Sequence, residues 1–241
     1  MSLFSHHYQH QGRGPTESGA APPSGPSSPI VYSQEIGSAT ANGTTGTTIA
    51  WSGSKTIGSN ADSLLWVGVL RYETGGAVTV ADNLGNTYTE AEATTQAAAF
   101  CNGFYAYVGS GTLTSVTATI PTSRYRGIII AEFYNVGEFV EAGAATSGSG
   151  SPQTWVNSKG ISAYGAALGI TVSNANNMTG AGSASGTPST TITAHVIANP
   201  DRGLMLLSAI AGSSAVTAFS GTSVVGAGSM GNAGAIFEAA A

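Results

Sequence analysis

Charged residues are scarce in this chain. Only 8% of its 241 residues are Asp, Glu, Lys or Arg, against a usual share of about 25%. Seven Lys and Arg residues in the whole chain are too few for the basic surface that binds nucleic acid, or for a polybasic patch on an anionic membrane. The formal net charge is -5. We therefore expect neither nucleic acid nor a membrane as a partner.

Cysteine and long apolar runs are nearly absent too. Cys101 is the single cysteine, so an intrachain disulfide is excluded and no second thiolate is available for zinc. Strand-sized runs such as Leu64–Leu70 are far too short to span a bilayer as a helix. The pair Leu3-Phe4 is followed at once by polar residues, which is not the pattern of a signal peptide. We expect synthesis in the cytoplasm of a host cell.

Residues 1–29 differ in composition from the rest of the chain. Five of the nine prolines lie between Pro15 and Pro29, among Gly and Ser, and such a segment cannot build a core. We predict an extended anchoring arm, 1–29, followed by a folded domain, 30–241. The arm begins with residues suited to docking in a groove on a partner protein: Phe4, His6, His7, Tyr8 and His10. The three histidines could hold a transition metal, but the docking interpretation is favoured and we predict no metal site.

From Ile30 onward the pattern predicts β-structure. Short apolar or alternating runs are separated by turn formers, and no helical period occurs. This pattern is typical of an all-β fold, a single jelly-roll-like β-sandwich. The predicted strands are Val31–Ile36, Thr47–Trp51, Ser63–Tyr72, Ala77–Ala81, Thr87–Glu90, Phe100–Val108, Ser115–Ile120, Gly127–Asn135, Gly165–Val172, Thr190–Ile197, Leu204–Ala211, Val216–Phe219 and Gly234–Ala239.

Four of these runs are apolar or small on both strand faces, whereas a sandwich strand with one wet face should alternate. Either loops cover their outer faces, or those faces meet another subunit. A short echo between Arg126-Gly127-Ile128 and Arg202-Gly203-Leu204 hints at two similar halves. The four runs are Leu64–Leu70, Ile128–Phe133, Ala166–Val172 and Leu204–Ala211.

Signatures of catalysis are weak. No serine lies in a G-x-S-x-G frame, and His195 is the only histidine after the arm; it is expected to be a satisfied or solvent-facing strand residue. Gly226–Gly231 matches G-x-G-x-x-G, but the residues after it favour a strand where a dinucleotide site needs a helix. We predict no catalytic residues and no cofactor, and hence no enzyme.

Glu132 is the most unusual carboxylate, because it shares a strand face with apolar residues. A carboxylate buried there needs a hydrogen-bond or ion-pair partner. Arg71, Arg124 or Arg126 could supply a structural ion pair. A glycoside hydrolase that uses Glu132 or Glu138 is the last-ranked hypothesis.

Aromatic side chains offer a second kind of site. Trp66 lies in an apolar run and is expected in the core, while Trp155 follows a Gly/Ser-rich loop and is expected to be exposed. Trp155 and Tyr72 are therefore the candidates for stacking on a ligand such as a sugar, with Tyr105 and Tyr107 also available on one strand face.

One stretch, about residues 60–135, resembles a β-sandwich module common in tailed-phage virion proteins and bacterial surface proteins. In that module a strand ends in an Asp-x-x-Gly-Asn turn, and a later apolar strand carries Glu and Tyr. The resemblance implies a jelly-roll-like scaffold on a virion or cell surface, and it implies no catalytic residue. The segments that carry it are Ser63–Leu70, Val78–Tyr88, Phe104–Tyr107, Val116–Thr119 and Ile130–Tyr134.

These observations favour a bacteriophage virion structural protein of the decoration, head-fibre or appendage type. Its arm would anchor it to the major capsid protein or to a protein of the tail or portal region. We expect a homo-oligomer, with a trimer as the first guess. The alternative is a carbohydrate-binding tail-fibre or adhesin protein that recognises a host glycan.

Overall fold

The computed structural model describes residues 25–72, 76–94, 99–143, 147–149, 152–173, 178–198, 203–225 and 229–241. All regular structure in these residues is β-strand, in antiparallel sheets, which confirms the predicted all-β sandwich. None of the described residues belongs to a helix that could cross a membrane. Most of the predicted arm lies outside the described residues, so the division at residue 30 stays a prediction.

The first half of the chain forms one sandwich of two sheets. Its large sheet has the strand order β1-β8-β3-β6-β5 and its small sheet the order β2-β7-β4. The strands are β1 (Val31–Ala41), β2 (Gly46–Ile57), β3 (Ser63–Arg71), β4 (Thr79–Asp82), β5 (Thr89–Ala93), β6 (Phe100–Val108), β7 (Gly111–Ser123) and β8 (Arg126–Tyr134).

The second half repeats this order. Its large sheet runs β14-β15-β12-β17, with β9 and the short β10 on the far side of β17, and its small sheet runs β11-β16-β13. Thus β9 corresponds to β1, β11 to β2, and β17 to β8. The strands are β9 (Val136–Gly143), β10 (Ser147–Ser149), β11 (Gln153–Ile161), β12 (Ala166–Ser173), β13 (Met178–Thr187), β14 (Ile192–Ala198), β15 (Gly203–Ile210), β16 (Val216–Val225) and β17 (Ser229–Ala239).

The structure thus has two sandwiches, where the sequence suggested one. A jelly roll would place the fifth strand of each half beside the fourth, in the small sheet. Here β5 and its counterpart β14 instead extend the large sheets, beside β6 and β15. We therefore describe each half by its strand order and not as a standard jelly roll.

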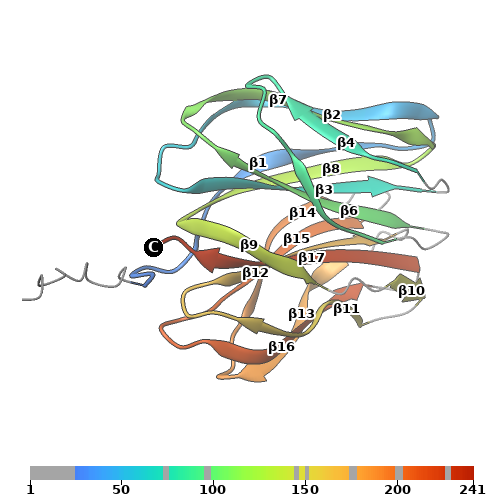
Figure 1. The fold of residues 1–241 in the computed structure, drawn as a ribbon. Coiled ribbons are helices and arrows are strands. Elements are labelled where there is room, and N and C mark those ends of the chain that lie inside the picture. Colours follow the sequence, from blue (N-terminus) through green and yellow to red (C-terminus); the bar gives the residue numbers. More distant parts are fainter. Residues whose placement is uncertain are drawn as a thin grey trace, which may run out of the picture.

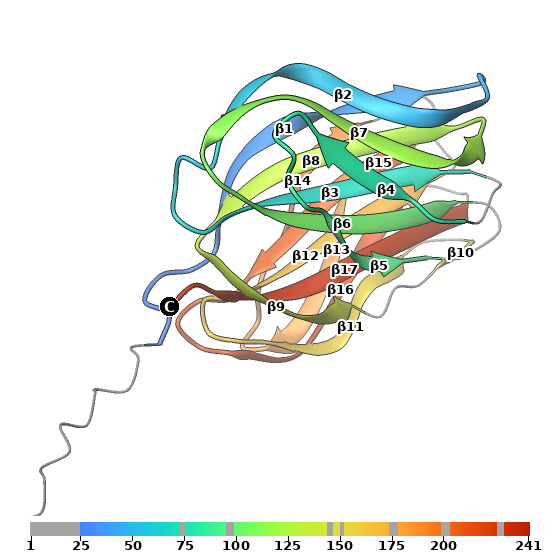
Figure 2. The same ribbon diagram turned by 45° about the horizontal axis from the view of Figure 1, so that its top comes forward.

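The four sheets stack as layers, with the two large sheets inside and the two small sheets outside (Figures 1 and 2). One core lies between the sheets of each half, and a third core joins the two large sheets through residues such as Trp66 and Leu168. At Gly68 the large sheets approach so closely that a Cβ would lie 2.6 Å from Ile170 Cδ1. The two halves are therefore one packed body.

This stacking explains the four runs that are apolar on both faces. They form β3, β8, β12 and β15, and each of these strands faces its own small sheet on one side and the other large sheet on the other. Both faces are covered within one chain, so these runs do not require the loops or the neighbouring subunit that the sequence left open.

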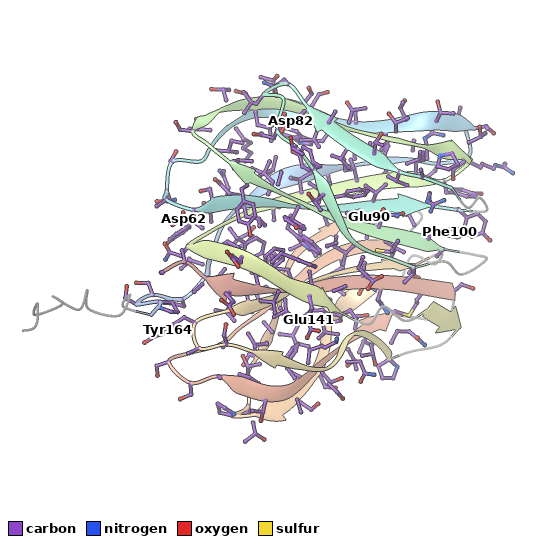
Figure 3. All side chains as sticks on the ribbon, in the orientation of Figure 1. Asp62, Asp82, Glu90, Phe100, Glu141 and Tyr164 are labelled. Carbon is purple, nitrogen blue, oxygen red and sulfur yellow. The ribbon has the colours of Figure 1, made fainter. Side chains whose placement is uncertain are left out.

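The two halves are related by a pseudo-two-fold axis that runs between the large sheets. Contacts across this interface come in reciprocal pairs: β1 meets β14 as β5 meets β9, and β8 meets β15 as β17 meets β6. The Ile30 backbone N–H donates to the Tyr164 carbonyl (2.9 Å), and the Val136 N–H donates to the Asp62 carbonyl (3.0 Å). Both acceptor residues have positive φ, 51° at Asp62 and 63° at Tyr164, and both lie at the same end of the molecule in Figure 3. The chain therefore has the architecture of a two-fold dimer whose two subunits are joined into one polypeptide.

A sequence signal for this duplication exists in the strands β2 and β11. The pattern Trp-x-x-Ser-Lys-x-Ile occurs at Trp51–Ile57 and again at Trp155–Ile161, and both tryptophans lie in the core of their own half. The echo at Arg126 and Arg202 is a different matter. Its first copy opens β8, and its second copy enters β15 at Gly203. Because β15 is the counterpart of β6 and not of β8, the echo does not mark equivalent positions.

Candidate functional site

Two clefts lie beside strands that the pseudo-two-fold axis relates, one against β6 and β9 and the other against β15 and β14. We call them the tyrosine cleft, of about 510 Å³, and the histidine cleft, of about 390 Å³. The tyrosine cleft is lined by Asp62, Tyr105, Tyr107, Val136, Gly137, Glu138 and Phe139. The histidine cleft is lined by Ser189, Thr190, Thr191, Thr193, His195, Ser208, Ile210 and Gly212.

Strand pairing shows which wall residues correspond. Tyr105 pairs with Trp66 in the first half, and Ser208 pairs with Leu168 in the second. Because side chains two apart share a strand face, Tyr107 then corresponds to Ile210. The same scaffold position thus holds an aromatic ring in one cleft and a small or aliphatic side chain in the other.

The edge strands complete this correspondence. Tyr32 of β1 pairs with Phe133, and Phe139 of β9 pairs with Phe237. The ring centroids lie 5.6 Å apart at 71° in the first pair and 5.7 Å apart at 72° in the second. The two ring pairs therefore correspond, but of these four rings only Phe139 lines a cleft.

Three rings form the apolar side of the tyrosine cleft. Tyr105 stacks on Phe139 with centroids 5.2 Å apart and planes at 10°, and Tyr107 meets Tyr105 edge-on at 5.9 Å. The Tyr107 hydroxyl donates to the Gly137 carbonyl, so its ring is fixed although the residue is 46% exposed. This arrangement offers a rigid aromatic surface to solvent.

Carboxylates form the polar side of the tyrosine cleft. Asp62 lies in the β2–β3 loop at the end of the molecule (Figure 3), and the backbone of this loop bonds to the start of β9. Glu138 is exposed on β9 beside the rings. Burial, Tyr105 and Glu138 together raise the pKa of Tyr107 to about 12, so its hydroxyl keeps its proton at neutral pH.

In the histidine cleft, His195 occupies the space that Tyr105 fills in the other cleft. Its ring stacks on Tyr32 at 3.9 Å and 13°, and its Nε2 shares a hydrogen bond of 2.6 Å with Ser208 Oγ. Desolvation lowers the pKa of His195 to about 4, so the ring is neutral at pH 7. No carboxylate is among the described residues that line this cleft, whereas a Ser–His–acid triad needs one beside the imidazole.

The expected exposure of Trp155 is wrong. This side chain is 0% exposed, and its ring covers Gly169 and Gly221, where a Cβ would lie 2.3 and 2.6 Å from ring atoms. The Gly/Ser-rich loop before it suggested a surface position, but β11 faces the core of the second half. Trp155 therefore cannot stack on a ligand in this structure, whereas Trp66 is in the core as predicted.

Tyr72 is partly buried and lies outside both clefts. Its ring meets Tyr125 edge-on at 5.5 Å, and its backbone N–H and carbonyl both bond to Ser123 Oγ. Its role in stacking on a ligand stays a prediction.

The arm residues Phe4, His6, His7, Tyr8 and His10 lie outside the described residues, so their docking role stays a prediction too. Within the described ranges, no group of three or more His, Cys, Asp or Glu side chains could hold a metal ion.

The expected ion pair of Glu132 is corrected by the structure. Glu132 is 2% exposed, and it accepts hydrogen bonds from Gln34 Nε2 (2.7 Å) and from the Gly58 backbone N–H (2.7 Å). Arg71 instead donates to Asn102 and lies over the Phe100 ring, while Arg126 donates to the Thr44 and Ser123 carbonyls. Neutral donors satisfy this carboxylate because it points into the first-half core, away from the strand ends where the arginines lie.

Of the two carboxylates of the glycosidase hypothesis, Glu138 lines the tyrosine cleft and Glu132 is buried outside it. Hydrolysis through either carboxylate stays a prediction.

Comparisons of the chain with protein-family models, with curated proteins and with solved structures gave no match in any of the three. The function is therefore argued from the molecule itself.

Proposed function

We propose that the protein is a structural protein of a bacteriophage virion, of the decoration, head-fibre or similar appendage type, which acts by contact and not by catalysis. The observation that carries this proposal is the scarcity of charge on the two outer sheets. The six strands of the small sheets contain three charged residues, Lys55, Asp82 and Lys159.

Two of these three charges are already engaged within the chain. Asp82 accepts hydrogen bonds from the Asn86 side chain (2.7 Å) and the Tyr88 hydroxyl (2.8 Å), and Lys159 forms a 2.8 Å ion pair with Glu141. Elsewhere the exposed residues of these strands are mostly Ser, Thr, Ala and Gly, with Asn157 and Val224 as the larger ones. Freely soluble domains carry about 25–35% charged residues on their surface, and charge is depleted at the centre of protein interfaces. The outer sheets therefore suit contact with neighbouring proteins.

One row of threonines crosses the outer sheet of the first half. Thr48, Thr119 and Thr79 lie side by side across β2, β7 and β4, and all three are exposed. Contacts through such a surface depend on apolar burial and hydroxyl hydrogen bonds, and salt screens them little. This supports a surface that assembles with neighbours, and the homotrimer stays part of the proposal.

The arm supplies the proposed anchor to the capsid, tail or portal region. Its described end, residues 25–30, leaves the fold at the end of the molecule where the C-terminus lies (Figure 1). The Ile30 backbone N–H bonds to the Tyr164 carbonyl of the second half. An arm that leaves one end can reach a neighbour without disturbing either sandwich.

Removal of residues 1–29 tests this proposal. Tagged full chain and tagged 30–241 are produced in infected host cells, and the copy number in purified particles is measured by quantitative mass spectrometry. We expect the full chain in particles at a fixed ratio to the major capsid protein and the truncated chain at a small fraction of it. A full chain that is absent from particles contradicts the virion role, and equal occupancy of the two chains contradicts the anchoring role of the arm.

A further inference from the structure

We infer that the tyrosine cleft is a binding site for a neutral saccharide. This inference goes beyond the virion role, since a structural protein needs no such site. It rests on the ring geometry, the two carboxylates and the comparison of the two clefts within one chain.

The size of the tyrosine cleft suits one or two sugar rings. Its volume of about 510 Å³ lies within the range of about 300–1,000 Å³ that is usual for small-molecule sites. The cleft opens between β6 and the start of β9, so a longer glycan could continue along the surface.

The rings supply an apolar platform. Among the described residues, Tyr107 is the only aromatic of the four most exposed large apolar side chains, which also include Leu84, Val140 and Val224. Its hydrogen bond to Gly137 and the stack of Tyr105 on Phe139 hold the platform in place before a ligand arrives. A preformed site loses little conformational entropy on binding, and the C–H face of a sugar ring packs well against an aromatic face.

The carboxylates supply hydrogen-bond acceptors. Asp62 and Glu138 can each accept bonds from sugar hydroxyls, and charged acceptors make stronger bonds than neutral ones. No Lys or Arg is among the described residues that line the cleft. Two negative charges without a cation repel sialic and uronic acids, so the charge favours a neutral sugar over an acidic one.

The histidine cleft serves as an internal control. In its lining, Ser208 and Ile210 stand where the other cleft has Tyr105 and Tyr107. The described residues that line it include no tyrosine, phenylalanine, tryptophan or carboxylate. We therefore assign saccharide binding to the tyrosine cleft alone.

The test uses the full chain on an array of neutral hexose and N-acetylhexosamine oligosaccharides beside their sialylated and uronic acid counterparts. The best neutral oligosaccharide is then titrated by calorimetry against the wild type and three variants. We expect Tyr107→Ala to weaken binding about tenfold and Glu138→Gln, an exposed and mild change, to weaken it severalfold. Ile210→Ala, at the position that corresponds to Tyr107, should leave binding unchanged.

Each other outcome contradicts the inference. These outcomes are a folded full chain that binds nothing on the array, a preference for acidic sugars, and binding that survives both Tyr107→Ala and Glu138→Gln. Thermal melting of each variant confirms that it is folded. Release of new reducing ends from the bound oligosaccharide would show hydrolysis instead of binding alone. None of these results depends on particle occupancy, so they are independent of the virion test.

Discussion

At the scale of single residues, two titratable side chains inside the fold are held by neutral partners. Glu132 is bound by a glutamine and a backbone amide, and His195 by a serine hydroxyl. A carboxylate or imidazole buried without a partner would cost several kcal/mol. The scarcity of charge in the composition thus continues into the core, where hydroxyls and amides replace ion pairs.

His195 gives this arrangement a pH dependence. Its pKa is about 4 in the folded chain, against about 6.5 in an unfolded chain. Between these values the unfolded state binds more protons than the folded state, so stability is complete above about pH 6.5 and falls as the pH drops toward 4. We expect the melting temperature of the wild type to fall more steeply over this window than that of His195→Asn.

Differential scanning fluorimetry across the pH window measures the difference between the two proteins. If the melting temperatures of the two proteins fell in parallel with pH, the His195 imidazole would not be desolvated as it is in the structure.

At the scale of elements, the central strands could be predicted from the sequence and the outer ones less well. β6 matches its prediction at both ends, and β3, β8, β12 and β15 match within a residue or so, because strands buried on both faces read as apolar runs. β9, β10, β11 and β13 were missed. β13 is made of Gly, Ala, Ser, Thr and one Met, which carries no apolar period, and β9 carries glutamates at exposed and half-buried positions.

The candidate site was visible in part. Tyr105 and Tyr107 share a strand face, which their spacing shows. Phe139 and Glu138 come from the missed strand β9, and Asp62 reaches the cleft through bonds between a loop and that strand. Such contacts between distant segments leave no local signal in a single sequence. The choice of Trp155 failed for a related reason, because its ring is covered by the next strand, β12, and by the distant strand β16.

The close approach of the two sheets of the second half at Gly169 gives a testable prediction at this scale. Gly169 of β12 lies beneath the Trp155 ring, with no space for a Cβ. Gly169→Ala must shift a fully buried indole, and overpacking of this kind costs about 1–3 kcal/mol. We expect that loss of unfolding free energy in chemical denaturation monitored by tryptophan fluorescence.

Gly212→Ala is the matched control, because nothing lies within 4 Å of a Cβ at that position. Equal stability of the two variants would contradict the placement of Trp155 against β12.

At the scale of the whole molecule, the two halves depend on each other. The central core takes Leu64, Trp66 and Ile129 from the first half, and Leu168, Ile170 and Leu206 from the second. Separation of the halves would expose all of these side chains to water, at a cost proportional to their apolar area. Because the inner faces of the duplicated sandwich are covered in this way, its two outer faces and its two clefts remain for contact with other molecules. The proposed virion role uses the outer faces, and the proposed saccharide binding uses the tyrosine cleft.

Differential scanning calorimetry of the full chain tests most directly whether two equivalent halves form one body. We expect a single transition whose calorimetric and van't Hoff enthalpies agree, and Gly68→Val, which intrudes on Ile170 across the interface, should lower the temperature of that one transition. Two separate transitions, of which Gly68→Val shifts one or neither, would contradict the shared core.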